Sequence, residues 1–181
     1  MLLKRIDRWL EVAKAYASFS RCSRAQLAAL YVSQDGVLLS VGYNGTIRGA
    51  KNCGTDIPCL KDKMNEPTRV SYNFCPAVHA ELNGIINAAR EGTSLLGSSL
   101  VINATKTMDC SPCLYCKRAI FQAGVYEVVW TDDKGRTKEE KTSEWVKQEN
   151  DWMTSILKRG VPPLEEGINP SKPISLVIEY V

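Results

Sequence analysis

The sequence predicts an α/β fold, a β-sheet with helices on its faces, and three observations support this prediction. Helical and strand-like segments follow one another in the order helix, strand, strand, helix, strand, helix, strand. At 181 residues the chain suits a single domain, residues 1–181, with a buried core. Hydrophobic residues make up 44% and charged residues 24% of the sequence, which are globular values and exclude a disordered or fibrous protein.

The first half of the chain predicts a helix followed by a hairpin. Residues 8–19 ("RWLEVAKAYASF") carry apolar residues at helical intervals. Two short apolar runs, 28–33 and 37–44, flank the dipeptide Asp35-Gly36, which is a common hairpin turn. We therefore expect two antiparallel strands after the first helix.

The second half predicts a helix after Pro76 that ends before Gly92. Its apolar face is expected to hold Val78, Leu82, Ile85, Ile86 and Ala89. The remaining segments are predicted as a strand (98–105), a helix (114–124), a strand (125–130), a charged surface stretch (132–144), a helix (144–157) and a last strand (174–181).

Composition also limits the location of the protein and the use of its cysteines. No apolar run reaches the roughly 20 residues that cross a bilayer, and charges interrupt the apolar residues near the N-terminus, unlike in a signal peptide. We expect a cytoplasmic protein with no membrane partner. Disulfides are rare in a reducing compartment, so the seven cysteines favour metal ligation. The formal net charge of +3 does not discriminate between small anions and nucleic acid.

Two short motifs carry the chemistry. Cys113 and Cys116 form a Cys-x-x-Cys pair at a predicted helix start, and His79 lies at the start of the preceding helix. Three such ligands leave a fourth tetrahedral position open, as in a catalytic zinc site. Glu81, two residues after the histidine, would stand beside that position and transfer protons. The alternative is a structural zinc held by the same three ligands.

The chain resembles the cytidine deaminase superfamily, and within it the phage and bacterial deoxycytidylate (dCMP) deaminases. The resemblance rests on "GYNG" (42–45), "HAELNGIINAAR" (79–90) and "SPCLYCKRAIFQAGVYEVVW" (111–130), and it covers roughly residues 5–130. The order H-x-E, then P-C-x-x-C, is a known signature of zinc deaminases. The resemblance implies a three-layer α/β/α cytidine deaminase-like fold with a central mixed sheet of about five strands, extended by residues 131–181.

The resemblance implies hydrolysis of dCMP to dUMP and ammonia, which would feed thymidylate synthesis. His79, Cys113 and Cys116 would hold the catalytic zinc, and Glu81 would protonate N3 of the pyrimidine and then the departing ammonia. The other implied substrate contacts are the backbone N–H of Ala80 with the pyrimidine O2, the carbonyl of Ser111 with the exocyclic amine, Asn44 and Tyr43 near the sugar, and Arg24 as a candidate for the phosphate.

The resemblance also implies regulation and assembly. Arg90 matches an arginine that lies, in phage-type members, by the site where dCTP activates and dTTP inhibits, and Asn83 lies in the same segment. Magnesium would accompany such a nucleotide effector. Enzymes of this kind are usually homo-oligomers, and we expect a hexamer.

Four further cysteines frame residues 46–75, a long segment without a clear period. They are Cys22, Cys53, Cys59 and Cys75. A segment of that length is usually functional or held by something else, and some phage and bacterial relatives carry a structural metal there. We expect a second, structural zinc on these four thiols; the alternative is a set of buried or free thiols. Cys110 is interpreted as a loop thiol.

Two residues depart from the family pattern. Ala28 stands where a small glycine is usual, and Gly84 stands where alanine is usual. They suggest the alternative hypothesis that the substrate is a 5-substituted dCMP.

Two other functions remain open. A deaminase of nucleic acid would need an aromatic and basic groove, and the sequence shows no such cluster, so we expect no stable nucleic-acid partner. The second is a non-catalytic zinc protein that binds nucleotides, and the presence of Glu81 argues against it, because such a protein would not need this carboxylate.

Overall fold

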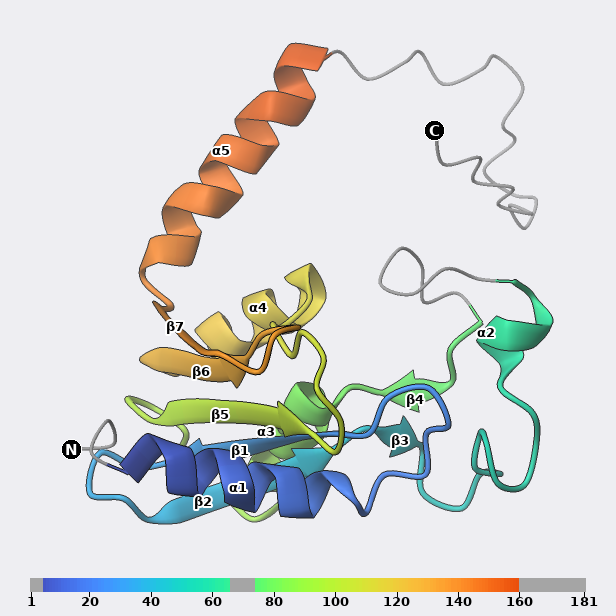
Figure 1. The fold of residues 1–181 in the computed structure, drawn as a ribbon. Helices are drawn as coiled ribbons and strands as arrows, with labels where there is room; N and C mark the ends of the chain where they lie inside the picture. The colour runs from blue at the N-terminus through green and yellow to red at the C-terminus, as the bar shows by residue number, and fades with distance from the viewer. Residues whose placement is uncertain (1–4, 66–73, 160–181) are drawn as a thin grey trace. The chain divides into compact units, whose positions relative to one another are not determined.

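The computed structural model describes residues 5–65 and 74–159 (Figure 1). Its centre is a five-stranded mixed sheet with the strand order β2-β1-β5-β6-β7, which confirms the predicted fold class. The strands are β1 (Leu27–Val32), β2 (Leu38–Tyr43), β5 (Ser99–Ala104), β6 (Glu127–Thr131) and β7 (Thr137–Lys141). Only β5 and β6 are parallel neighbours; the other pairs are antiparallel.

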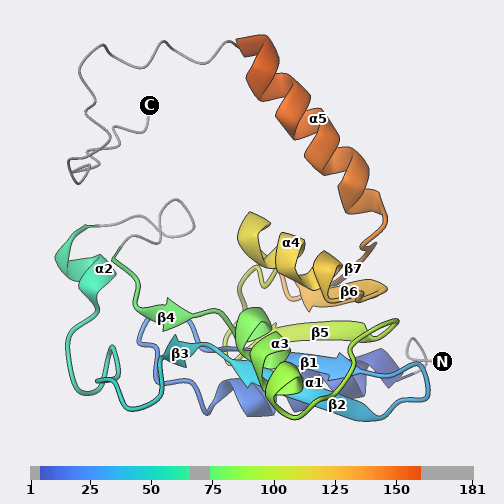
Figure 2. The same cartoon turned by 180° about the vertical axis from the view of Figure 1, so that it is seen from behind.

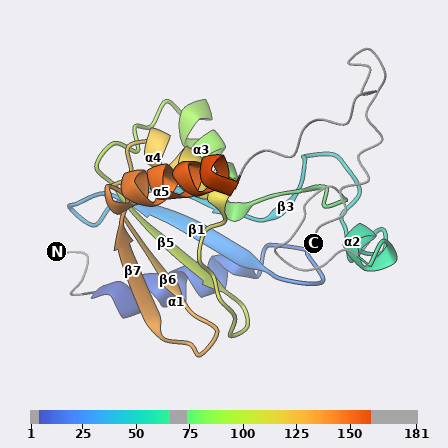
Figure 3. The ribbon, with the colours of Figure 1, turned by 90° about the horizontal axis from the view of Figure 1, so that it is seen from above.

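Helices cover both faces of the sheet, as the views from behind and from above show (Figures 2 and 3). Helix α1 (Ile6–Ala17) lies on one face, and α3 (Ala80–Arg90) and α4 (Leu114–Gln122) lie on the other. The three layers are therefore α/β/α.

Strand β1 illustrates how the sequence produces these layers, because side chains of a strand alternate between the two faces. Leu30 and Val32 join the core beneath α1, whereas Ala29 and Tyr31 join the core beneath α3 and α4. All four are completely buried. A strand covered on both faces carries a continuous apolar run instead of an alternating one, and "LAALYV" has this pattern.

The predicted hairpin is confirmed, and the turn between its strands explains Gly36. Residues 28–32 pair with residues 38–43 in antiparallel register. Gly36 adopts a φ of +80°, a left-handed conformation that L residues with a Cβ rarely reach. The glycine therefore allows the tight connection between β1 and β2.

The helix after Pro76 differs from the prediction in its start and in its buried face. Val78 lies in the short strand β4 (Ala77–Val78), which pairs with β3 (Gly45–Thr46). Leu82 and Ile85 pack against the core as predicted, but Ile86 is 48% exposed and Ala89 is exposed. The buried residues of α3 are Ala80, Glu81, Gly84 and Ala88.

The buried residues of α3 include small ones because the helix lies very close to β2. A Cβ placed on Gly42 would come within 2.2 Å of the carbonyl oxygen of Ala80, so position 42 requires glycine, and the α3 residues Ala80 and Gly84 that face it are small. A pattern of large apolar residues cannot indicate such a face.

Two other segments differ from the sequence-based expectation. The charged stretch 132–144 contains the edge strand β7, and the long segment 46–75 contains the short helix α2 (Leu60–Lys63) besides β3. The predicted strand at 174–181 lies outside the described residues.

The predicted helix at 144–157 is confirmed as α5 (Glu144–Arg159). The chain divides into two compact units, 1–146 and 147–181, so α5 runs from the first into the second. None of the described helices is both long and apolar enough to span a membrane.

Candidate metal centre and active-site cavity

Two helix starts bring the three candidate zinc ligands together. His79 and Cys113 are the residues immediately before α3 and α4, and Cys116 lies in the first turn of α4. Nδ1 of His79 is 3.5 Å from the sulfur of Cys113 and 3.4 Å from that of Cys116. The three donor atoms lie within 4.8 Å of one another, and no other group of three among the described residues meets this distance.

The donor set fits a zinc ion. Zinc binds thiolate sulfur at about 2.3 Å and imidazole nitrogen at about 2.1 Å in tetrahedral geometry, which separates sulfur from nitrogen by about 3.6 Å. The observed 3.4 and 3.5 Å are close to this separation. Nδ1 is then the nitrogen of His79 that would face the metal.

The electrostatics of the two thiols favour an ionised Cys113. A hydrogen bond from the Cys116 thiol, followed by one with His79, lowers the pKa of Cys113 to about 4. The pKa of Cys116 is raised, because its thiol donates to Cys113 and is buried. The hydrogen bond with Cys113 also raises the pKa of His79. The group thus holds one negative sulfur even before a metal ion replaces the shared protons.

Glu81 is buried beside this group. It lies in the first turn of α3 with 6% of its surface exposed. Burial raises the pKa of its carboxyl, while hydrogen bonding with Cys116 is among the weaker effects that lower it. A carboxyl with a raised pKa is suited to accept and return a proton near neutral pH.

Tyr31, on strand β1, is hydrogen-bonded to the first turn of α3. Its hydroxyl donates a 2.9 Å hydrogen bond to the backbone carbonyl of Glu81, and its ring is completely buried. Burial raises the pKa of this hydroxyl well above its usual range, with smaller contributions from Glu81 and Cys116. Tyr31 therefore stays protonated and holds the backbone of Glu81 in place.

A cavity of about 350 Å³ opens onto these residues. Four of the substrate-contact candidates line it beside His79, Glu81 and Cys113: Arg24, Asn44, Ala80 and Ser111. Their assigned contacts with a substrate stay predictions, but the structure places all four at one cavity.

Asn44 has a structural task at this cavity. Its Oδ1 accepts from the backbone N–H of Leu27 and its Nδ2 donates to the carbonyl of Ala25, both at 2.8 Å. Ala25 and Leu27 line the cavity as well. The side chain thus fixes the wall formed by the start of β1, in addition to any contact with a sugar.

The structure does not bring Tyr43 to the cavity. Its ring is 43% exposed and stacks on Phe19 with centroids 5.9 Å apart. Tyr43 lies outside the cavity although its neighbour Asn44 lines it, because successive side chains along an extended strand point to opposite sides.

The two residues predicted for an effector also lie away from the cavity lining. Asn83 donates a 2.8 Å hydrogen bond to the carbonyl of Tyr43. Arg90 is exposed at the last turn of α3, ten residues after Ala80, which corresponds to about 15 Å along a helix.

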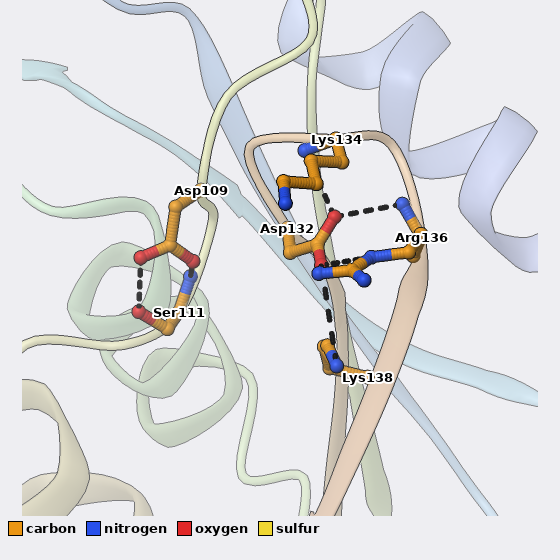
Figure 4. A network of polar contacts seen from close by, with 6 residues as sticks. All are labelled: Asp109, Ser111, Asp132, Lys134, Arg136 and Lys138. Atoms are coloured by element: carbon orange, nitrogen blue, oxygen red, sulfur yellow. Dashed lines mark hydrogen bonds and ion pairs between the residues drawn. The ribbon is translucent and has the colours of Figure 1, made fainter.

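Asp109 is a cavity residue that the sequence did not indicate. Its carboxylate accepts from the backbone N–H of Ser111 at 3.0 Å and from the hydroxyl of Ser111 at 2.9 Å (Figure 4). Both residues line the cavity. Aspartate commonly binds the backbone two residues on, so the sequence "DCS" before the Cys-x-x-Cys pair was a usable but unspecific signal.

The four cysteines of the predicted structural site line a second, smaller cavity of about 40 Å³. Cys53 has a raised pKa, mainly through burial, and its neighbours Cys59 and Cys22 contribute to the rise. The thiols thus share one cavity, although no three of them reach ligand distance of one another. The structural zinc stays a prediction. Cys110 is buried, and its sulfur is 3.4 Å from the carbonyl oxygen of Met108.

Comparisons with known proteins agree with this geometry. The family described as the cytidine and deoxycytidylate deaminase zinc-binding region matches residues 3–132. A deoxycytidylate deaminase of Mycobacterium phage D29 is 32% identical over 68% of this chain and 91% of the phage protein. One of Schizosaccharomyces pombe is 33% identical over 67% of this chain, but the match spans only 35% of the yeast protein.

Among solved structures, the dCMP deaminase of cyanophage S-TIM5 in complex with dCMP and dUMP is similar. It has 30% sequence identity and a TM-score of 0.55, over 73% of this chain and 84% of the phage chain. Sequence, fold and the geometry of the metal-ligand group agree, and the chain therefore belongs to the cytidine and deoxycytidylate deaminase family of hydrolytic deaminases.

Proposed function

We propose that the protein hydrolyses dCMP to dUMP and ammonia. The main support is the cavity that places the buried Glu81 beside His79, Cys113 and Cys116. Its volume of about 350 Å³ lies within the usual range for small-molecule sites. The names of the relatives, deoxycytidylate deaminases from a phage and a yeast, support this substrate class.

His79, Cys113 and Cys116 would hold a zinc ion through one nitrogen and two sulfurs. When bound, zinc supplies a hydroxide nucleophile at neutral pH, because it lowers the pKa of a water molecule from 15.7 to about 7. The positive ends of α3 and α4 point at this group, since His79 and Cys113 immediately precede the two helices. Both helices thereby stabilise the negative charge of the thiolates.

Glu81 would carry the protons of the reaction. A new bond forms between the water oxygen and C4 of the pyrimidine, and the bond between C4 and the exocyclic nitrogen breaks. Glu81 would take a proton from the attacking water and give it to N3. It would then take the remaining proton of the new C4 hydroxyl and give it to the amine, which leaves as ammonia while C4 becomes a carbonyl. The burial that raises the pKa of this carboxyl suits both directions of transfer.

Three further residues would orient the pyrimidine. The N–H of Ala80 belongs to the first turn of α3, where backbone donors have no partner within the helix, and it would donate to O2. The carbonyl of Ser111 would accept from the exocyclic amine. Asp109 would keep that carbonyl in place through its two hydrogen bonds to Ser111.

The proposal is tested by ammonia release from dCMP, cytidine and dCTP. We expect turnover of dCMP by the wild type and a fall of about 10²- to 10⁴-fold in Glu81→Gln, which cannot exchange protons. Glu91→Gln is the matched control, since Glu91 is exposed just beyond α3. Wild-type rates in Glu81→Gln would contradict the assigned role.

We further propose a structural zinc on Cys22, Cys53, Cys59 and Cys75, because these thiols line one small cavity. Regulation by dCTP and dTTP near Arg90, and a homo-oligomer, remain predictions from the resemblance. Adding dCTP or dTTP to the same ammonia assay tests the regulation.

A further inference from the structure

We propose that Lys61 and Arg24 form the subsite for the phosphate monoester of the nucleotide, with Lys61 as the residue that favours a nucleotide over a nucleoside. This inference rests on the proposed function and adds a specificity-determining residue, Lys61, which no sequence motif indicates. It is based on the burial of Lys61, its place in two adjoining cavities, and the ion pair of Arg24 with Asp62, the neighbour of Lys61 in α2.

Lys61 is buried, which is rare for a lysine side chain. It lies in α2 with only 6% of its surface exposed, whereas Lys63 of the same helix is exposed. The side chain of Lys61 therefore lies inside the protein and not on its outer surface. Lys61 also lines the active-site cavity, so a ligand in that cavity would meet its charge.

The position of Lys61 within the cavity matches the far end of a nucleotide. Lys61 and Arg24 line both the active-site cavity and the small cysteine-lined cavity. Glu81, Ser111 and Cys113 line only the former. The two cations thus lie where the cavities adjoin, away from the residues that would hold the pyrimidine. A nucleotide with its base at Glu81 would extend its phosphate toward them.

The charge distribution along the cavity supports this orientation. The acidic cavity residues are Glu81 and Asp109, and Asp109 is hydrogen-bonded to Ser111 at the pyrimidine end. The cationic residues of the lining, Arg24 and Lys61, lie at the other end. Lys61 is still close enough to His79 to lower the pKa of the imidazole slightly. A dianionic phosphate would therefore meet the cationic side chains of the lining at the Lys61 end.

An ion pair joins Arg24 to Asp62, the neighbour of Lys61 in α2. Nε of Arg24 is 3.5 Å from Oδ1 of Asp62, the residue after Lys61. This contact holds α2 against the segment that precedes β1. Arg24 is 26% exposed at its side chain, so it would contact the phosphate from the rim while Lys61 contacts it from within.

The test compares Lys61→Met with the wild type on dCMP and on deoxycytidine, which lacks the phosphate. A hydrogen bond to a charged group contributes roughly 1.5 to 3 kcal/mol, which corresponds to about a 10- to 150-fold change. We expect kcat/KM for dCMP to fall by that factor, mainly through KM, with deoxycytidine turnover unchanged. Lys61→Arg should keep most of the preference for dCMP, and Lys63→Met should leave both substrates unaffected.

An equal fall on both substrates, or no fall on dCMP, would overturn the inference. Binding of dUMP and of deoxyuridine, measured by calorimetry, tests the phosphate subsite independently of the proposed reaction. If the wild type releases no ammonia from dCMP, the reaction is wrong, yet weaker binding of dUMP alone in Lys61→Met would still support the subsite. Lys61→Gln serves as a second neutral variant if Lys61→Met does not fold.

Discussion

Gly84 is a residue whose role becomes clear only from its neighbour. A Cβ at this position would lie 2.4 Å from Cε2 of Tyr31, whose ring is completely buried. Tyr31 in turn holds the carbonyl of Glu81. Glycine at 84 thus makes room for the ring that supports the first turn of α3.

Gly84→Ala is therefore expected to destabilise the protein. Helix propensity alone favours alanine by about 1 kcal/mol, but overpacking of a tight core typically costs about 1 to 3 kcal/mol. Because the Tyr31 ring cannot move into solvent, we expect a net loss and a lower melting temperature in thermal unfolding. A higher melting temperature would show that propensity dominates and that the ring yields.

The same observation weakens the sequence argument for a 5-substituted substrate. Neither Ala28 nor Gly84 lines the active-site cavity. The glycine at 84 reflects packing between β1 and α3, since Tyr31 fills the space that an alanine at 84 would need. A single sequence shows which residue is unusual but not which neighbour it faces.

The group of candidate metal ligands could be located from the sequence because its signal is local. His79, Glu81, Cys113 and Cys116 each stand at a helix start that the sequence indicates, and the spacing within each motif sets the side chains' positions. Asp109 lies in the loop before α4 and Lys61 in the four-residue helix α2, and no sequence pattern indicates that either residue lines the cavity.

At the scale of elements, β7 explains why a charged segment can be a strand. Its sequence "TKEEK" is almost entirely exposed, as edge strands of sheets often are. Glu140 accepts from Nζ of Lys117 at 3.0 Å and from Nε1 of Trp145 at 2.6 Å. These contacts tie the strand to α4 and to the start of α5, although no apolar alternation marks it.

The turn between β6 and β7 depends on Asp132, whose carboxylate accepts from the backbone N–H groups of Lys134 and Arg136 at 2.9 Å (Figure 4). The side chain of Arg136 adds an ion pair at 2.7 Å. Hydrogen bonds from Arg136 lower the pKa of Asp132 to about 2. The ionised carboxylate is thus the form that closes the turn.

Asp132→Asn should accordingly lower stability in a pH-dependent way. The unfolded pKa of aspartate is about 3.9, so the stabilisation is complete above that value and disappears as the pH falls through about 2. We expect a lower melting temperature at pH 7 and a difference from wild type that narrows in acid. Asp133→Asn is the control, because Asp133 is exposed. If the difference in melting temperature between Asp132→Asn and the wild type did not change with pH, the assigned role of the ionised carboxylate would be wrong.

At the scale of the whole molecule, the fold follows from the order of elements and the burial of the central strands. The fifth strand of the sheet is β7, a segment that the sequence indicated only as charged surface. The layers could be predicted because apolar runs identify β1, β5 and β6. Residues 46–75 could not be predicted in the same way, because no periodic pattern marks this segment, and the structural zinc proposed for it stays a prediction.

Measuring the zinc content of the purified protein tests the proposed structural zinc site. If Cys22, Cys53, Cys59 and Cys75 hold a structural zinc, purified protein should contain about two zinc ions per chain, and Cys59→Ser should contain about one and melt earlier. Cys110→Ser is the matched control, since Cys110 is a buried thiol outside both groups. An unchanged zinc content in Cys59→Ser would contradict the second site.

The most direct test of the central claim is ammonia release from dCMP by the zinc-loaded protein, with Glu81→Gln in parallel. We expect turnover by the wild type and a loss of at least about 10²-fold in the variant. No release from dCMP by a wild type that holds zinc at His79, Cys113 and Cys116 would mean that the substrate is wrong. Equal release by both proteins would mean that Glu81 does not transfer the proton.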